Sequence, residues 1–120
     1  MPTNNGGSIK SFTSAVAGGR VRLHGSKHVF QVTGQTSAGA GSATYKIQFS
    51  SVDSPDEDAT SGDDGGAWVD AGPAVTMTLS ATIQSDYLVI DAPWKWARLN
   101  VSAISGTDAT VEFHKSTSAF

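Results

Sequence analysis

The stretch that decides the fold is KWARLNVSAISGTDATVEFHK, residues 95–115. Apolar residues occupy alternate positions from Leu99 to Ala103, and they do so again from Ala109 to Phe113. Between these two runs, residues 105–108 (SGTD) have the composition of a turn. A period of two residues is typical of strands with one buried and one exposed face, so we expect an antiparallel hairpin with Ile104–Asp108 as its loop. The expected cross-strand pairs are Ala103 with Ala109, Val101 with Val111, and Leu99 with Phe113.

The whole chain has the composition of a small all-β domain. Its 120 residues suffice for one domain with a two-layer core, and its 13 glycines and many Ser and Thr residues favour strands and turns. It has no cysteine, which excludes disulfides and thiol chemistry. Residues 1–8 (MPTNNGGS) lack the apolar core of a signal peptide, and no apolar run approaches the ~20 residues of a membrane span. We therefore expect a soluble protein made in the cytoplasm, or one exported by a route without such a signal.

Charge is divided unevenly along the chain, whose net charge is −3. Residues 1–50 contain five Lys or Arg residues and no acid, whereas residues 51–120 contain all 11 acids and three Lys or Arg residues. This asymmetry is typical of a protein with a charged interaction surface. The alternative is that strands from the two halves interleave, so that the charges mix in space.

Residues 1–19 are expected to form an extended N-terminal arm, and residues 20–120 the folded domain. The first residues are polar, and Ile9, Phe12 and Val16 are widely spaced among Ser, Thr and Gly residues that give a helix little support. We expect these three side chains to become ordered only where they find a pocket, on the body of the protein or on a neighbour.

The rest of the chain divides into short strands separated by turns. Residues 34–42 (GQTSAGAGS) are predicted to be a flexible loop, and residues 85–86 a turn. Residues 87–90 (YLVI) are apolar at every position, which predicts a strand that is central or covered by a partner. With the hairpin this gives about eight strands and no crossover helix, so we expect a two-sheet antiparallel β-sandwich of jelly-roll type. The other expected strands are residues 20–24, 28–33, 44–52, 67–71 and 75–83.

Residues 53–66 (DSPDEDATSGDDGG) are expected to form a solvated loop. Six acids, one proline and three glycines within this segment are incompatible with the interior of a strand. Calcium binding is the alternative, because carboxylates are good ligands for this ion. The order of acids in an EF-hand is absent, however, so we do not expect a metal site here.

No pattern of catalytic residues is present. His24 and His28 are four residues apart, but a Gly-Ser-Lys turn separates them, and we expect them and His114 to be ordinary surface histidines. The chain has no G-x-S-x-G nucleophile elbow and no phosphate-binding glycine loop. We therefore expect a protein that is not an enzyme and that has no metal, cofactor or catalytic site.

Four aromatic residues suggest a sugar-binding platform instead. Trp68, Tyr87, Trp94 and Trp96 are candidates for stacking against sugar rings, as in carbohydrate-binding sandwiches, and Trp96 shares the outward parity of Arg98. The alternative is that Trp94 and Trp96 close one end of the sandwich or pack against another subunit. Nucleic acid is disfavoured as a ligand by the net negative charge.

Several segments together resemble small β-sandwich structural proteins of tailed bacteriophages, found as capsid decoration (cement) proteins or fibre modules. The resemblance covers about residues 44–115 and rests on residues 45–50 (YKIQFS), the Asp/Gly loop, Trp68, residues 87–90 and residues 98–107. It implies a non-enzymatic virion protein that is made in the host cytoplasm, binds the major capsid protein on the outer capsid surface, and forms a homo-oligomer. A trimer is favoured over a dimer, with no nucleic acid or membrane partner.

A carbohydrate-binding or head- or tail-fibre module, with a glycan as ligand, is the alternative function. Under the decoration hypothesis, the arm, its basic neighbours and the exposed aromatics are the expected contact residues. The candidate partner-binding residues are Ile9, Lys10, Phe12, Val16, Arg20, Arg22, Tyr87, Trp94 and Trp96.

Overall fold

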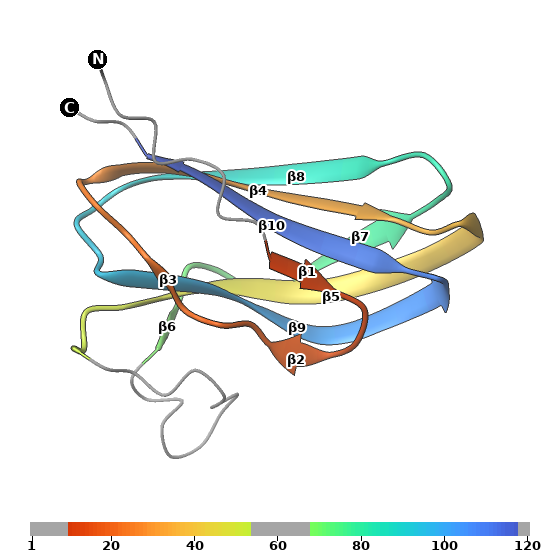
Figure 1. Ribbon diagram of the computed structural model, residues 1–120, viewed down its shortest axis with the longest axis horizontal. Helices are drawn as coiled ribbons and strands as arrows, with labels where there is room; N and C mark the ends of the chain where they lie inside the picture. The colour runs from red at the N-terminus through yellow and green to blue at the C-terminus, as the bar shows by residue number, and fades with distance from the viewer. Residues whose placement is uncertain (1–9, 54–67, 118–120) are drawn as a thin grey trace.

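The chain forms a two-sheet antiparallel β-sandwich in the computed structural model, which describes residues 10–53 and 68–117 (Figure 1). The all-β, two-layer prediction is confirmed, with ten strands in the described ranges rather than about eight. Sheet A contains, in spatial order, β1 (Lys10–Phe12), β10 (Thr110–Thr117), β4 (Lys27–Gln35) and β8 (Gln84–Asp91). Sheet B contains β2 (Val16–Ala17), β9 (Trp96–Thr107), β5 (Ala38–Ser50) and β6 (Val69–Asp70), with β3 (Val21–Arg22) on β9 and β7 (Val75–Leu79) on β5.

The expected hairpin between residues 95 and 115 is wrong, although both of its strands exist. β9 pairs with β5 in sheet B, whereas β10 pairs with β4 in sheet A. The chain therefore crosses from one sheet to the other between Thr107 and Thr110, where Asp108 adopts a positive φ of 49°. Leu99 and Phe113 are both buried, as predicted, but on opposite sheets. Period-two alternation identifies a buried face without distinguishing a hydrogen-bonded partner from a strand across the core.

A β-bulge in β9 changes which side chains face the core. Thr44 is opposite Ala103 and Tyr45 is opposite Val101, so Ser102 is an extra residue on β9. Beyond the bulge the parity reverses: Ala103 is exposed, whereas Ile104 packs against the core. The predicted inward position of Ala103 is therefore wrong.

The glycine-rich segment 34–42, predicted to be a loop, is mostly strand. β4 continues to Gln35 and β5 begins at Ala38. Two of its glycines allow close packing, because a Cβ at Gly34 would overlap Leu79 and one at Gly41 would overlap the backbone of β9, whereas Gly39 provides a positive φ beside the turn.

The segment around β7 and β8 also differs from the prediction. β7 ends at Leu79, so the expected strand at residues 75–83 is too long, and Ala81 and Ile83 beyond its end are exposed. The turn therefore precedes Gln84, and residues 85–86 belong to β8. β8 is an edge strand that pairs with β4 alone among the described strands, so the expectation of a central strand is wrong, whereas the alternative of a strand covered by a partner stays a prediction.

Residues 10–17 of the expected arm form β1 and β2. β1 pairs with β10 and β2 with β9, so this segment joins both sheets. Phe12 is 5% exposed and belongs to the core, because it fills the space between the layers. Residues 1–9, including Ile9, lie outside the described residues, as does the expected acidic loop 53–66 apart from Asp53.

Aromatic side chains dominate the core between the layers. The rings of Phe30 (β4) and Phe113 (β10) are stacked with centroids 5.6 Å apart, and Phe49 (β5) approaches Phe30 from the opposite sheet at 5.5 Å. Trp94 stacks on Phe49 at 5.7 Å, which places it at the edge of the core. These ring contacts hold the two sheets at a fixed spacing, and they do not use the side chains of the outer faces.

Candidate functional site

The outer face of sheet A presents a row of three side chains from three neighbouring strands. Tyr87 on β8 lies opposite Gln31 on β4, which in turn lies opposite His114 on β10. We call these three residues the central row. The row follows from the alternation of β4 and β8, because Phe30 and Leu88 are cross-strand partners and turn inward, which directs Gln31 and Tyr87 outward. Side chains directly opposite each other are close enough to contact one ligand.

Tyr87 is the most exposed large apolar residue of the described chain. It is 72% exposed, although β8 is well paired along its length with β4. Its backbone N–H donates to Asp86 Oδ1 at 2.9 Å, a local bond beside the ring. A large aromatic side chain on a rigid strand is typical of a contact residue, because it offers area at little cost in conformational entropy.

Polar residues flank the central row on one side. Thr33 lies opposite both Ser85 and Glu112, and Glu112 lies opposite Ser11, so this polar row crosses all four strands of sheet A. Its members are linked to the central row and to each other by contacts among the described side chains. These contacts are Thr33 Oγ1 with His114 Nε2 at 3.2 Å, Gln31 Nε2 to Ser85 Oγ at 3.4 Å, Ser11 Oγ to Glu112 Oε2 at 3.3 Å, and His114 Nε2 with Glu112 Oε1 at 3.8 Å.

Apolar residues flank the central row on the other side. Val29 and Val89 are cross-strand partners, 43% and 62% exposed. Together with Tyr87 they make a short apolar strip beside the amide of Gln31 in the central row, across that row from the hydroxyl and carboxylate groups of the polar row. The outer face of sheet A thus offers an aromatic ring, hydrogen-bond donors and hydrogen-bond acceptors on one rigid surface.

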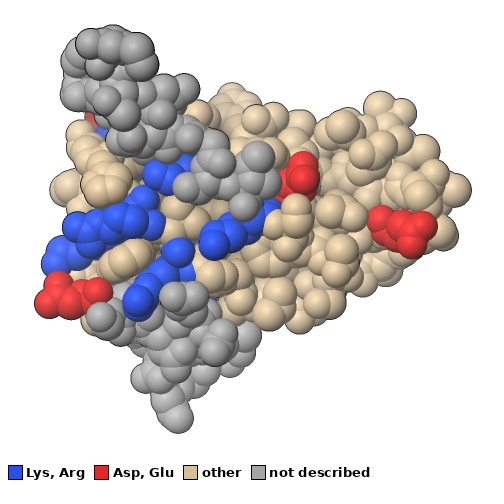
Figure 2. Space-filling view, in the orientation of Figure 1, with Lys and Arg blue, Asp and Glu red and all other residues tan. Residues whose placement is uncertain are grey.

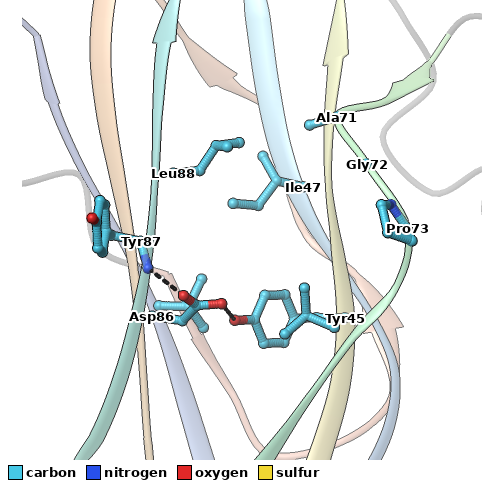
Figure 3. A pocket seen from close by; sticks show the side chains of 10 residues that line it. Tyr45, Ile47, Ala71, Gly72, Pro73, Asp86, Tyr87 and Leu88 are labelled. Atoms are coloured by element: carbon cyan, nitrogen blue, oxygen red, sulfur yellow. Dashed lines mark hydrogen bonds between the residues drawn. The ribbon is translucent and has the colours of Figure 1, made fainter.

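The second feature is a groove at the open edge of the sandwich, between β8 and the segment 71–75 (Figure 3). Its volume is about 270 Å³, and its lining is mainly apolar. The Tyr45 hydroxyl donates to Asp86 Oδ2 at 3.1 Å within the groove. Burial, and then the negative charge of Asp86, raise the pKa of Tyr45, so its hydroxyl stays protonated and remains a donor.

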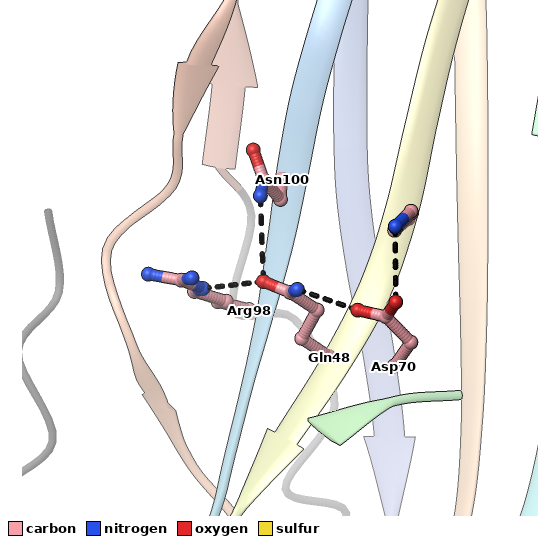
Figure 4. Close-up of polar contacts among 5 residues, drawn as sticks. Gln48, Asp70, Arg98 and Asn100 are labelled. Atoms are coloured by element: carbon pink, nitrogen blue, oxygen red, sulfur yellow. Dashed lines mark hydrogen bonds and ion pairs between the residues drawn. The ribbon is translucent and has the colours of Figure 1, made fainter. Parts of the chain in front are cut away.

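Two polar side chains on the outer face of sheet B, Gln48 and Arg98, are buried and take part in a group of polar contacts (Figure 4). Arg98 is fully buried; its Nε donates to Gln48 Oε1 at 2.8 Å, and its guanidinium lies over the ring of Trp68 at 4.4 Å. Gln48 Nε2 donates to Asp70 Oδ1 at 2.7 Å, and Lys46 pairs with the same carboxylate at 2.9 Å. The hydrogen bond from Gln48, and then that from Lys46, lower the pKa of Asp70. These contacts connect β9, β5 and β6 and stabilise the sheet.

Trp96 lies beside two arginines, one in β3 and one just before it. Arg20 and Arg22 have their guanidinium carbons 4.7 and 5.2 Å from the centre of its ring. Figure 2 shows Lys and Arg side chains gathered at the end of the molecule where Figure 1 places β3. The basic first half and acidic second half also meet directly, since Lys46 pairs with Asp70. Charge therefore mixes across the halves, with a local excess of cations near Trp96.

The candidate residues predicted from the sequence do not form one surface. Phe12 is in the core, Trp94 packs on Phe49, and Trp68 is buried against Arg98. Tyr87 and Trp96 lie on different sheets, so the four aromatics are not a single platform. Lys10, Val16 and Arg22 are exposed and Arg20 is half-buried.

Sequence reasoning missed Gln31, His114 and Asp86, whose positions depend on strand pairing. It also placed His28 on the surface, whereas His28 is 1% exposed. The parity of β4 explains this error, since His28, Phe30 and Val32 all face inward. Among the described residues no group of three or more His, Asp or Glu side chains could hold a metal ion, and no helix could span a membrane.

No protein-family model matches the chain, and no curated protein matches it in sequence. A solved structure described as "CBM4 structure and function", a carbohydrate-binding module, is similar with a TM-score of 0.47 and 15% sequence identity. The match covers 91% of this chain and 71% of the other. Similarity of this size does not extend to a binding site or a ligand.

Proposed function

We propose that the protein is a non-catalytic binding module that holds carbohydrate on the outer face of sheet A. The observation that carries the proposal is the central row, Tyr87, Gln31 and His114, set in register across three strands with Tyr87 72% exposed. The ring of Tyr87 offers a flat apolar surface for the C–H face of a sugar. Gln31 and His114 supply donors and acceptors for sugar hydroxyls beside it.

The chemistry of this face favours a neutral, hydroxyl-rich ligand. Glu112 accepts hydrogen bonds and, with Ser11 and Thr33, lines one side of the row. Neighbouring strands are about 4.8 Å apart, so three strands place contacts over roughly 10 Å. That length suits an oligosaccharide lying across the strands better than a single sugar ring.

Titration of isotope-labelled protein with soluble neutral polysaccharides (β-glucan, xylan and galactomannan), followed by amide chemical shifts, tests the proposal. We expect saturable shifts confined to the outer face of sheet A, centred on Gln31, Tyr87 and His114. Shifts that map instead to sheet B, or no shift with any of the polysaccharides, would contradict the proposed site.

Capsid decoration is the second candidate, and one observation favours it. Val29 and Val89 are exposed cross-strand partners beside Tyr87, and contiguous exposed apolar residues are typical of protein contact surfaces. On this proposal the partner is the major capsid protein of a virion, with the chain acting as a homo-oligomer. Co-sedimentation with undecorated capsids that is abolished by Val89→Asp would support it. The same variant retaining full occupancy would argue against this surface.

A further inference from the structure

The groove at the edge of the sandwich lies mainly on the inward side of β8, because Asp86 and Leu88 alternate with the outward residues, although Tyr87 of the central row also borders it. Leu88 and Val32 reach it from sheet A, and Ile47 reaches it from sheet B. Ala71 and Pro73 form its rim in the stretch where neither β6 nor β7 pairs with β5. At this edge of sheet B the Ala71 N–H still donates to the Ile47 carbonyl at 2.8 Å, and beside this bond the groove opens the apolar interior to a ligand from outside.

Among the described residues that line the groove, Asp86 alone carries a carboxylate. Asp86 accepts one hydrogen bond from the Tyr45 hydroxyl at 3.1 Å and one from the Tyr87 backbone at 2.9 Å. A carboxylate has about four lone-pair sites, so two of its acceptor positions are left for a ligand. None of the ion pairs formed among the described residues involves Asp86.

We propose that this groove binds a small organic cation, a protonated primary amine on an apolar body, with the ammonium on Asp86. The apolar body lies against Ile47, Leu88 and Pro73, and the ammonium donates to the free acceptor positions of the carboxylate. Figure 3 shows Asp86 and Tyr45 together at one end of the groove and Leu88 and Ile47 facing each other above them.

Charge decides the class of ligand. A carboxylate beside apolar walls has lost part of its hydration. An ammonium compensates for this loss with a charge-assisted hydrogen bond, whereas a neutral or an anionic ligand cannot. Tyr45 cannot supply the missing charge, because its protonated hydroxyl is a neutral donor. The volume of about 270 Å³ is slightly below the usual range for drug-sized ligands, so the ligand is small.

The experiment uses three probes of similar shape: phenethylamine, phenethyl alcohol and hydrocinnamate, which are cationic, neutral and anionic at pH 7. Each is titrated into the isotope-labelled full chain, and amide shifts are followed. We expect phenethylamine to give saturable shifts at Ile47, Ala71 and Leu88. The alcohol is expected to bind at least about tenfold more weakly, because it lacks the charge-assisted hydrogen bond.

Two variants and one control locate the site. Asp86→Asn keeps the size of the side chain and an acceptor for Tyr45, and should weaken phenethylamine binding by about tenfold or more. Asp91→Asn removes the same charge from an exposed position on the same strand and should leave binding unchanged. Ala71→Trp should block the groove from its exposed rim, so it tests the site without touching the carboxylate.

Equal affinity for the amine and the alcohol would overturn the proposal, as would undiminished binding by Asp86→Asn or by Ala71→Trp. Absence of any saturable shift with phenethylamine would also overturn it. Tyr87 borders the groove and belongs to the central row, so the amine probes and the variants Asp86→Asn and Ala71→Trp, rather than Tyr87, separate these outcomes from carbohydrate binding.

Discussion

Phe30 on β4 and Phe49 on β5 meet across the sandwich with ring centroids 5.5 Å apart and planes inclined by 55°. They belong to different sheets, and both are almost fully buried. This contact joins the two layers. Phe113 stacks on Phe30 on one side of it, and Trp94 stacks on Phe49 on the other. The outer faces can therefore differ in chemistry while the spacing of the sheets stays fixed.

Val101→Asp is expected to unfold or aggregate the protein. Val101 is 1% exposed and belongs to the core, so the variant would bury an unpaired charge at a cost of several kcal/mol. Ala103→Asp is the matched control, because the bulge at Ser102 turns Ala103 outward. Thermal melting should show a severe loss for the first variant and a change within about 0.5 kcal/mol for the second. Equal loss in both would mean that the bulge is absent.

Gln48→Ala is expected to cost about 1.5–3 kcal/mol in the free energy of unfolding, the usual worth of a hydrogen bond to a charged group. Gln48 accepts from the buried Arg98 and donates to Asp70, so the variant removes two contacts between three strands. Asn100→Ala is the comparison, since its contact with the same oxygen is 3.5 Å long. Urea denaturation should separate the two variants by at least about 1 kcal/mol. Indistinguishable curves would show that the contacts in Figure 4 contribute little.

Stability is expected to fall as pH falls below about 6.5. Burial, above all, and the nearby Lys115 and His24 charges lower the pKa of His28, whereas its backbone contact with Gly25 works in the opposite direction. Unfolded protein then binds a proton that folded protein does not, so stability is complete above pH 6.5 and declines between 6.5 and the lowered folded pKa. The slope from one such group approaches about 1.4 kcal/mol per pH unit.

Urea denaturation of the parent and of His28→Gln at pH 7.5 and 5.5 measures this effect. The parent should lose more stability than the variant between the two pH values. His24→Gln, at an exposed position, should keep most of the parent's pH dependence, because the His24 charge is the smallest of the causes that lower the pKa of His28. A pH dependence that survives in His28→Gln would assign it to another group.

The sequence predicted the sandwich and most of its inward residues, but not the partners of its strands. Leu99, Val101, Val111 and Phe113 alternate as a hairpin would, yet β9 and β10 face each other from different sheets. The alternation of apolar residues does not show whether two strands are hydrogen-bonded in one sheet or face each other across the core. The prediction that Ala103 faces inward failed because a bulge inserts one residue into β9. Such a bulge leaves no clear mark in the sequence.

The candidate site was predicted only at Tyr87. Gln31 and His114 are polar residues on alternating strands, and nothing in their local sequence distinguishes them from other surface residues. They lie beside Tyr87 because β4 pairs with both β8 and β10, a relation between segments more than 50 residues apart. The grouping of Trp94 and Trp96 with Tyr87 failed for the same reason, since nearness in sequence does not place residues on the same sheet.

The most direct test of carbohydrate binding on sheet A compares Tyr87→Ala with Trp96→Ala in calorimetric titrations with a polysaccharide that shifts the amides of the parent. The account predicts that Tyr87→Ala weakens binding by at least about tenfold, the worth of a well-placed aromatic contact, while Trp96→Ala binds as the parent does. Both variants should keep the melting temperature of a folded sandwich. Undiminished binding by folded Tyr87→Ala, or loss of binding in folded Trp96→Ala alone, would contradict the account.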